Sequence, residues 1–140
     1  MKTFTVKSAN PKENISKPHF FVLCKGMNSG KPLEGRCPNS FCIISDSEEE
    51  KEQLYWISFA LWRFNAFYPY LMGSVIPYIR INDFTRLVNE KLMVVHSNPE
   101  GFSEVVKQLK LIELREKQFQ ENLKLIQELK RAYVYKYFYQ

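Results

Sequence analysis

The sequence predicts an α+β fold, in which a small mixed sheet with packed helices precedes a long protruding C-terminal helix. Two short apolar runs with strand propensity, His19–Cys24 and Ser40–Ser45, predict the sheet. An apolar stripe with a period of about 3.5 residues predicts the long helix. The 140 residues allow one domain with a modest core. We therefore divide the chain into an α+β globular domain at 1–97 and a long amphipathic helix for dimerisation or docking at 98–140.

The N-terminal part is predicted to contain strands and loops. Thr3–Lys7 alternates weakly and fits either an edge strand or a loose tail, and Asn10–Lys17 fits a loop. Between the two apolar runs, Gly26–Asn39 holds three glycines and two prolines, which favour a long irregular loop.

The next segment predicts a helix that begins after Asp46 or Ser47 and ends near Phe67. Either residue can act as the N-cap, and three glutamates in the first turn favour the helix dipole. Both tryptophans, Trp56 and Trp62, are expected to pack rather than to bind a ligand. The expected core positions of this helix are Leu54, Ile57, Phe59, Ala60, Leu61 and Phe64.

Residues 74–97 are predicted to alternate between strand and helix. Ser74–Ile81 alternates as a strand, and Pro77 places that strand at an edge or interrupts it. Asn82 or Asp83 then caps a short helix through Val88, and Leu92–Val95 is expected to be a further strand.

The long helix has a well-defined predicted start. Asn98 fits the N-cap, Pro99 the first helical position and Glu100 the first turn. Its apolar stripe is interrupted only by Glu116 and Lys130, and a helix with such a stripe must pair with something, such as a second copy or another subunit. Whether the helix is continuous or folds back as a hairpin near Gln118–Asn122 stays open. The predicted interface residues are Val105, Leu109, Ile112, Phe119, Leu123, Ile126 and Tyr133.

A basic, glycine-rich loop indicates possible contact with DNA. The chain carries a net charge of +5, and its N-terminal part is rich in lysine. Gly26–Pro32 does not fit an ATP-binding phosphate loop, because only three residues separate its glycines and Pro32 stands where a hydroxyl residue would bind magnesium. The alternative for this loop is a solvated surface without a ligand. The candidate nucleic-acid-binding residues are Lys25, Lys31 and Arg36 for phosphates and Asn28, Ser29 and Asn39 for base edges.

Catalytic and membrane functions find no support in the residue pattern. The three cysteines show no Cys-x-x-Cys spacing, and their odd number fits reduced thiols in the cytoplasm. The two histidines are far apart, so we expect no metal, no cofactor and no catalytic set. Charged and proline residues interrupt the apolar stretch 57–79, and the N-terminus lacks the apolar core of a signal peptide. We therefore expect no membrane partner.

Two segments together resemble a known family. Gly73–Phe84, then Leu92–Val95, Pro99 and the helix Val105–Phe138 resemble the end of a target-recognition domain in the DNA-specificity subunits of type I restriction–modification systems. The resemblance covers roughly residues 39–140, and it implies a DNA-recognition domain closed by a long helix that joins a methylase. The chain also resembles small uncharacterised proteins of gut anaerobic bacteria.

Two functional hypotheses follow. The first is a non-enzymatic DNA-binding, target-recognition-like module, whose long helix dimerises it or docks it on a partner. The second is a protein–protein adaptor or oligomerisation module that does not bind nucleic acid, for which the apolar stripe matters and the basic loop does not.

Overall fold

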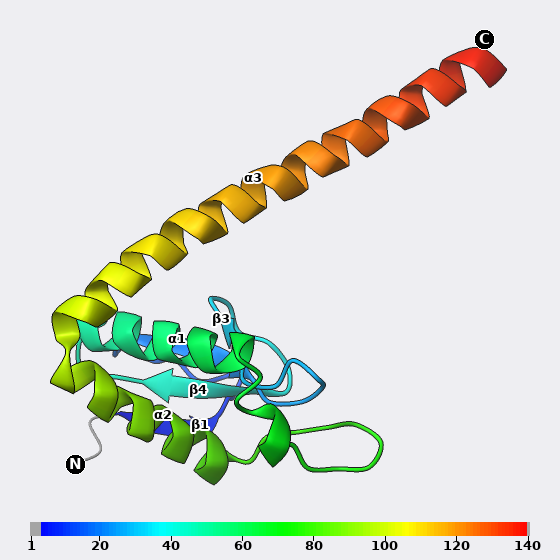
Figure 1. Cartoon of the computed structure of the whole chain (residues 1–140). Coiled ribbons are helices and arrows are strands. Elements are labelled where there is room, and N and C mark those ends of the chain that lie inside the picture. The colour runs from blue at the N-terminus through cyan, green and yellow to red at the C-terminus, as the bar shows by residue number, and fades with distance from the viewer. Residues whose placement is uncertain (1–3, 140) are drawn as a thin grey trace. The chain divides into compact units, whose positions relative to one another are not determined.

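A computed structural model describes residues 4–139 and confirms the α+β class (Figure 1). The chain divides into two compact units, the globular unit up to Ser97 and a second unit from Asn98 onward. The elements are β1 (Thr5–Ser8), β2 (His19–Leu23), β3 (Pro32–Leu33), β4 (Ser40–Ile44), α1 (Glu48–Arg63), the 3-10 helix η1 (Tyr68–Tyr70), α2 (Ile81–Ser97) and α3 (Pro99–Phe138).

The four strands form one sheet in the order β1-β4-β2-β3. Every neighbouring pair is antiparallel, so the predicted mixed sheet is wrong in this detail. Phe20 lies opposite Ile43 and Val22 opposite Phe41 across the central pair. The predicted strands at these two apolar runs are confirmed. Of the two alternatives for Thr3–Lys7, the edge strand is correct for residues 5–7, which belong to β1, and Thr3 lies outside the described residues. The predicted long loop after β2 is confirmed except for the two residues of β3.

The start of α1 follows the predicted capping chemistry. The Ser47 hydroxyl accepts a hydrogen bond from the backbone N–H of Glu50 at 3.1 Å, and the Glu50 carboxylate accepts one from the N–H of Asp46 at 3.1 Å. The first bond satisfies a backbone donor that the first turn of a helix leaves without a partner, and the second holds the residue before the N-cap. Ser47 is therefore the N-cap.

The end of α1 differs from the prediction. The helix ends at Arg63 rather than near Phe67, because Asn65 adopts a left-handed backbone conformation with φ of 56°. The N–H of Ala66 then bonds back to the carbonyl of Leu61, which closes the helix end. This turn leaves Phe64 86% exposed, so its prediction as a core residue is wrong, and it places Phe67 in the core at 1% exposure.

The predicted strand at Ser74–Ile81 is wrong. Met72 and Tyr78 exchange two backbone hydrogen bonds that close a projecting loop, here called the 72–78 loop, between η1 and α2 (Figure 1). Gly73, with a φ of +95°, turns the chain at the start of this loop, and the chain returns to Met72 at Tyr78 instead of extending as a strand. Pro77 has no N–H to donate to a ladder.

A single helix, α2, replaces the predicted short helix and the predicted strand at Leu92–Val95. Leu92 and Val95 are buried, and they continue the apolar face of Phe84 and Val88 at helical spacing. Met93 and Val94 point to solvent. The run of four apolar residues thus crosses two faces of one helix, which is why it looks like a strand in the sequence.

The second unit consists of α3, a helix of 40 residues, and its capping residues. The side-chain oxygen of Asn98 accepts a hydrogen bond from the N–H of Gly101 at 3.1 Å, and Pro99 occupies the first turn, as predicted. The helix is unbroken at residues 118–122, so the hairpin alternative is wrong. At 1.5 Å per residue its length is about 60 Å.

The packing of Phe67 closes the core of the globular unit. Its ring stacks on that of Phe84 with 5.4 Å between centroids, and Phe84 also meets Phe41 edge-on. On another side, Phe67 lies against Gly30, where a Cβ atom would overlap the ring. The β2–β3 loop, the segment after α1 and helix α2 therefore meet at one ring.

Gly30→Ala tests this packing. The new methyl group would overlap a fully buried ring, and the φ of +99° at Gly30 disfavours any side chain. We expect the free energy of unfolding to fall by about 3 kcal/mol, from backbone strain and overpacking together. Chemical denaturation followed by tryptophan fluorescence measures it.

Two other glycines serve as matched controls. Gly26 has a similar φ of +94° but open space where a methyl group would lie, so Gly26→Ala isolates the strain and should cost about 1 kcal/mol. Gly35 has open space and no positive φ, and Gly35→Ala should change stability by less than about 0.5 kcal/mol. Equal losses at Gly26 and Gly30 would contradict the ring contact.

Candidate binding surface

The β2–β3 loop and the 72–78 loop are joined by backbone hydrogen bonds. The N–H of Gly26 donates to the carbonyl of Pro77 at 2.6 Å, and the N–H of Ile79 donates to the carbonyl of Cys24 at 3.0 Å. Lys25 forms a bridge with Tyr78 between these two bonds. Two segments that are far apart in the sequence therefore present one continuous surface.

The C-terminal turn of α1 completes this surface. The indole N–H of Trp62 donates to the side-chain oxygen of Asn28 at 3.4 Å. The Lys31 ammonium lies 5.3 Å from the centre of the Trp62 ring, and the Arg63 guanidinium lies 4.4 Å from it. Both distances fall within the range of cation–π attraction. We call residues 24–31 and 59–80 together the cationic end.

The cationic end carries positive charge without a carboxylate of its own. Its charged residues are Lys25, Lys31, Arg63 and Arg80, and neither segment contains Asp or Glu. The nearest acids along the chain are Glu34, three residues after Lys31, and Asp83, three residues after Arg80. Asp83 accepts a hydrogen bond from Arg80 at 2.8 Å. An anionic ligand would therefore meet several cations on a surface whose two segments contribute no acid.

The candidate residues from the basic loop divide into two groups. Lys25, Asn28 and Lys31 lie together in the cationic end. Ser29 also lies there but is only 2% exposed, and its hydroxyl donates to the carbonyl of Gly26 at 2.7 Å. The expectation that Ser29 reaches base edges therefore does not fit the structure, because this hydroxyl closes the loop from inside.

Arg36 and Asn39 lie outside this group and have structural roles. Arg36 donates to the carbonyls of Pro11 and Glu13 at 2.7 and 2.6 Å, and its guanidinium covers the ring of Phe21. Asn39 is exposed, with a φ of 60° that turns the chain into β4. The interactions of Arg36 hold the loop after β1 in place, which accounts for its charge without a ligand.

Sequence reasoning misses Trp62, Arg63 and Arg80 as surface residues. Trp62 is expected to pack, and it is half-buried, but Lys31 and Arg63 both lie over its ring. The sequence signal for these surface residues is a tryptophan followed by an arginine close to the predicted end of a helix. Only the fold shows that this helix end lies beside the basic loop.

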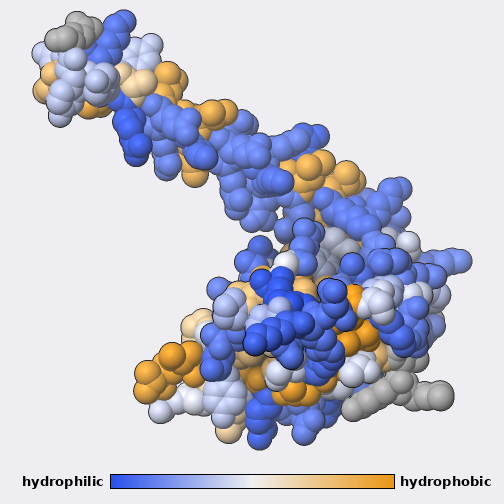
Figure 2. Space-filling view, turned by 180° about the vertical axis from the view of Figure 1, so that it is seen from behind, coloured by the Kyte–Doolittle hydropathy of each residue, from blue (hydrophilic) through white to orange (hydrophobic). Residues whose placement is uncertain are grey.

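Apolar side chains are also exposed at the cationic end. The 72–78 loop carries Val75 at its tip, 89% exposed, and Ile76 beside it. In Figure 2, the view from behind, hydrophobic atoms gather on the projecting edge of the globular unit. The exposed large apolar residues of the cationic end are Met27, Phe64, Tyr68, Met72, Val75, Ile76 and Tyr78.

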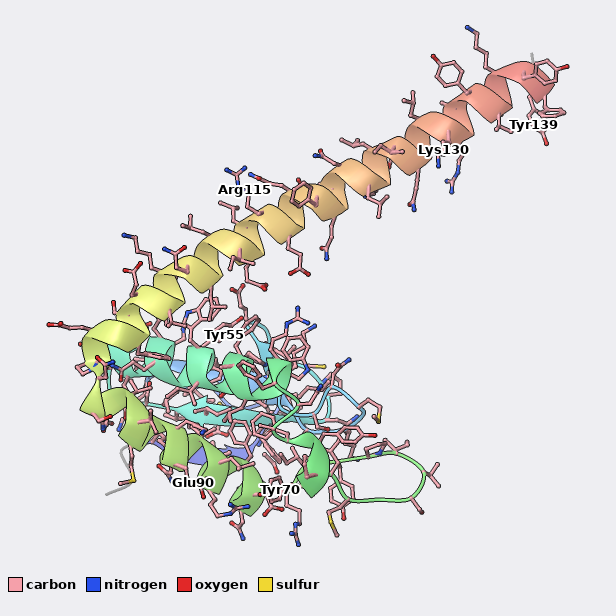
Figure 3. The ribbon with its side chains drawn as sticks, viewed as in Figure 1. Tyr55, Tyr70, Glu90, Arg115, Lys130 and Tyr139 are labelled. Atoms are coloured by element: carbon pink, nitrogen blue, oxygen red, sulfur yellow. The ribbon has the colours of Figure 1, made fainter. Side chains whose placement is uncertain are left out.

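Helix α3 carries the second candidate surface. Side chains such as Arg115, Lys130 and Tyr139 extend on all sides of the helix (Figure 3). Along the predicted stripe, Phe119 is 71% exposed. A shallow groove on this face is lined by Ile112, Arg115, Glu116, Phe119, Gln120 and Leu123. Ile112, Leu123, Ile126 and Tyr133 are exposed as well, and Leu109 and Val105 occupy the same stripe one and two turns before Ile112.

Comparison with known families gives one match. A family model described as a family of unknown function (DUF6943) matches residues 6–136. The chain belongs to this family. The matched region runs from β1 into the last turns of α3, so both units are part of the DUF6943 pattern. No curated protein and no solved structure matches the chain.

The DUF6943 match does not link the chain to restriction–modification target-recognition domains. The resemblance to those domains depends on a strand, a short helix and a second strand before the long helix. The structure has the 72–78 loop and the single helix α2 in that region. The long helix itself is present.

The described residues contain no group of three or more His, Cys, Asp or Glu side chains placed to hold a metal ion. No helix among them is long and apolar enough to cross a membrane. All three cysteines are free, and burial raises the pKa of the Cys24 and Cys42 thiols above the ordinary value. These two thiols are therefore protonated and weakly nucleophilic at neutral pH.

The raised pKa values have a consequence for stability. The folded chain holds these thiol protons more tightly than the unfolded chain. At neutral pH this difference contributes to the free energy of unfolding. This contribution is lost as the pH rises above about 9, the ordinary range of a thiol, through the folded pKa.

Cys42 provides a test of this burial. With Cys24→Ser and Cys37→Ser in place, Cys42 is the sole thiol, and it is 1% exposed. We expect it to react with a disulfide reagent near neutral pH more than about a hundredfold more slowly than the same protein in denaturant, because reaction requires opening of the sheet. Absorbance of the released thiolate gives both rates, and similar rates would contradict the buried position in β4.

Proposed function

We propose that this DUF6943 protein is a non-enzymatic nucleic-acid-binding module that contacts phosphates through its cationic end. The observation that carries the proposal is the grouping of Lys31 and Arg63 at the ring of Trp62, on a surface without a carboxylate within its two segments. Neighbouring cations favour a polyanion, because each phosphate contact releases bound counterions. The proposal does not include a role in restriction–modification.

The roles of individual residues follow from their positions. Lys25 is exposed beside the 72–78 loop, so its ammonium can approach a phosphate directly. Lys31 and Arg63 are held near the indole, which limits the side-chain entropy they lose on binding. The side-chain N–H groups of Asn28 remain available for a base edge or a sugar, because only its oxygen is used by Trp62.

Binding to duplex DNA over a series of salt concentrations tests the proposal. Lys31→Glu should lower affinity by about tenfold or more for every sequence alike, and it should reduce the slope of log K against log salt by about one. Fluorescence anisotropy with random-sequence DNA measures both quantities, at a protein concentration for which the mass in solution is known.

Lys91→Glu is the matched control. Lys91 is exposed on α2, outside the cationic end, and the substitution changes the net charge by the same amount. Its effect should be small compared with that of Lys31→Glu. Equal effects would mean that only net charge matters. Binding that is insensitive to salt, or that is absent for both duplex and single-stranded DNA, would refute the proposal.

A second candidate function, self-assembly, is favoured by α3. Its apolar stripe faces solvent for most of a 40-residue helix, and a second copy carries the same stripe. Exposed apolar stripes of this length indicate an interaction surface, because helices of proteins gain most of their stability from packing an apolar face. The lining of the groove around Phe119 comes from residues three and four apart on one helix face, the spacing that forms a hole for a knob from another helix. The alternative occupant is the helix of another protein.

Phe119→Asp tests this function. A carboxylate in the middle of the stripe would be buried without a partner in a paired helix, so we expect the Kd of the oligomer to rise by at least about tenfold. Sedimentation velocity over a range of concentrations measures the association.

Gln118→Asp introduces the same charge one residue away and off the stripe, so it should leave association nearly unchanged. Circular dichroism shows whether α3 stays helical in both variants. An oligomer that persists unchanged in Phe119→Asp, or a wild-type protein that is monomeric at all concentrations, would refute pairing through this face.

A further inference from the structure

We propose that the ligand of the cationic end is a single-stranded nucleic acid, bound in preference to a duplex. This inference rests on the proposed function and adds the class of ligand. Its basis is the set of exposed aromatic side chains in the same two segments as the cations. The faces of unpaired bases stack on such rings, whereas a duplex hides those faces.

The exposed rings are concentrated at this one surface. In the described part of the globular unit, the exposed aromatic side chains are Phe64, Tyr68 and Tyr78. All three belong to the cationic end. The remaining rings of the unit are buried or half-buried in the core and along α1. Chance exposure of apolar residues would scatter these rings over the whole unit.

The backbone under each ring is fixed. Phe64 caps α1, and its N–H bonds to the carbonyl of Ala60. Tyr68 opens η1, and its N–H bonds to the carbonyl of Asn65 at 3.1 Å. Tyr78 pairs with both Met72 and Lys25. The rings thus stand on ordered backbone, which lowers the entropy lost when a base stacks on them.

Cations occur at short sequence distances from the rings. Arg63 precedes Phe64, Lys25 lies opposite Tyr78, and Lys31 lies over Trp62. A flexible strand can place its phosphates on these cations and turn its bases toward the rings. The backbone of a duplex can reach the same cations but leaves the rings without a partner. The interaction with rings is therefore the part that distinguishes the two ligands.

The aliphatic side chains at the tip of the 72–78 loop allow stacking of bases to be distinguished from simple burial of apolar surface. Val75 and Ile76 are exposed but have no π face on which a base can stack. A lipid surface with negative charge would use these two side chains, because it accepts any apolar group beside cations. A single strand would use the rings instead.

The experiment compares three ligands with the full chain at one salt concentration. The probes are a labelled mixed-sequence single strand of about 16 nucleotides, within the range of single-strand sites, its duplex, and vesicles that contain phosphatidylserine. We expect the single strand to bind at least about tenfold more tightly than the duplex.

Two sets of variants assign that preference. The double substitution of Phe64→Ala with Tyr68→Ala should remove the preference for the single strand and leave the affinity for the duplex within about twofold. Val75→Ser with Ile76→Ser is the matched control and should change neither affinity. All four side chains are exposed, and unchanged thermal unfolding confirms that each variant is folded.

Each other outcome overturns a specific statement. Equal or tighter binding of the duplex overturns the single-strand inference and leaves the proposed nucleic-acid function intact. Binding of neither nucleic acid overturns both. Vesicle binding that depends on Val75 and Ile76, without binding of either nucleic acid, overturns both in favour of an anionic membrane surface. A preference for the single strand that persists without Phe64 and Tyr68 overturns the role of the rings.

Discussion

The burial of Phe67 is the interaction on which the arrangement of the globular unit depends. Its ring occupies the space left by the missing side chain of Gly30 and stacks on Phe84. To place Phe67 there, α1 must stop at Arg63 and the chain must turn through the left-handed Asn65. The same turn directs Phe64 to solvent. The most exposed ring of the cationic end is thus a direct consequence of the packing of the most buried one.

This contact also determines which charged groups meet. Because Phe67 holds the β2–β3 loop against the end of α1, Lys31 from the loop and Arg63 from the helix approach the same indole ring. Neither segment of the cationic end contributes a carboxylate, so within this surface the ring supplies the attraction that the two cations share. Core packing, rather than pairing of opposite charges within these segments, therefore assembles this surface.

Local chemistry allowed the sequence to predict much of the fold. The caps at Ser47 and Asn98, the two apolar strands and the long helix depend on neighbours within a few residues, and all appear in the structure. The errors occur where tertiary contacts decide. Leu92–Val95 has the composition of a strand, but burial of Leu92 and Val95 on one face makes it helical. Likewise, the alternating pattern of Ser74–Ile81 does not reveal that this segment forms a loop that pairs with Lys25.

The candidate site was predictable only in part, for the same reason. The basic loop is visible in the sequence, because Lys25 and Lys31 flank a glycine-rich segment. The contribution of Trp62 and Arg63 is not, since it requires knowing that two segments distant in the sequence meet. Arg36 shows a different limit, because its charge predicts a phosphate contact, whereas the structure shows hydrogen bonds to the carbonyls of Pro11 and Glu13 that the sequence does not reveal.

The two candidate functions reinforce each other physically. If α3 pairs with a second copy, each assembly carries two cationic ends, and a strand that is bound at one of them meets the other at an effective concentration set by the assembly rather than by the solution. Modest affinity at one site, such as three cations and a few rings supply, would then be sufficient for tight overall binding. Loss of pairing should therefore weaken the binding of long strands more than that of short ones, which links the function of the stripe around Phe119 to that of the cationic end.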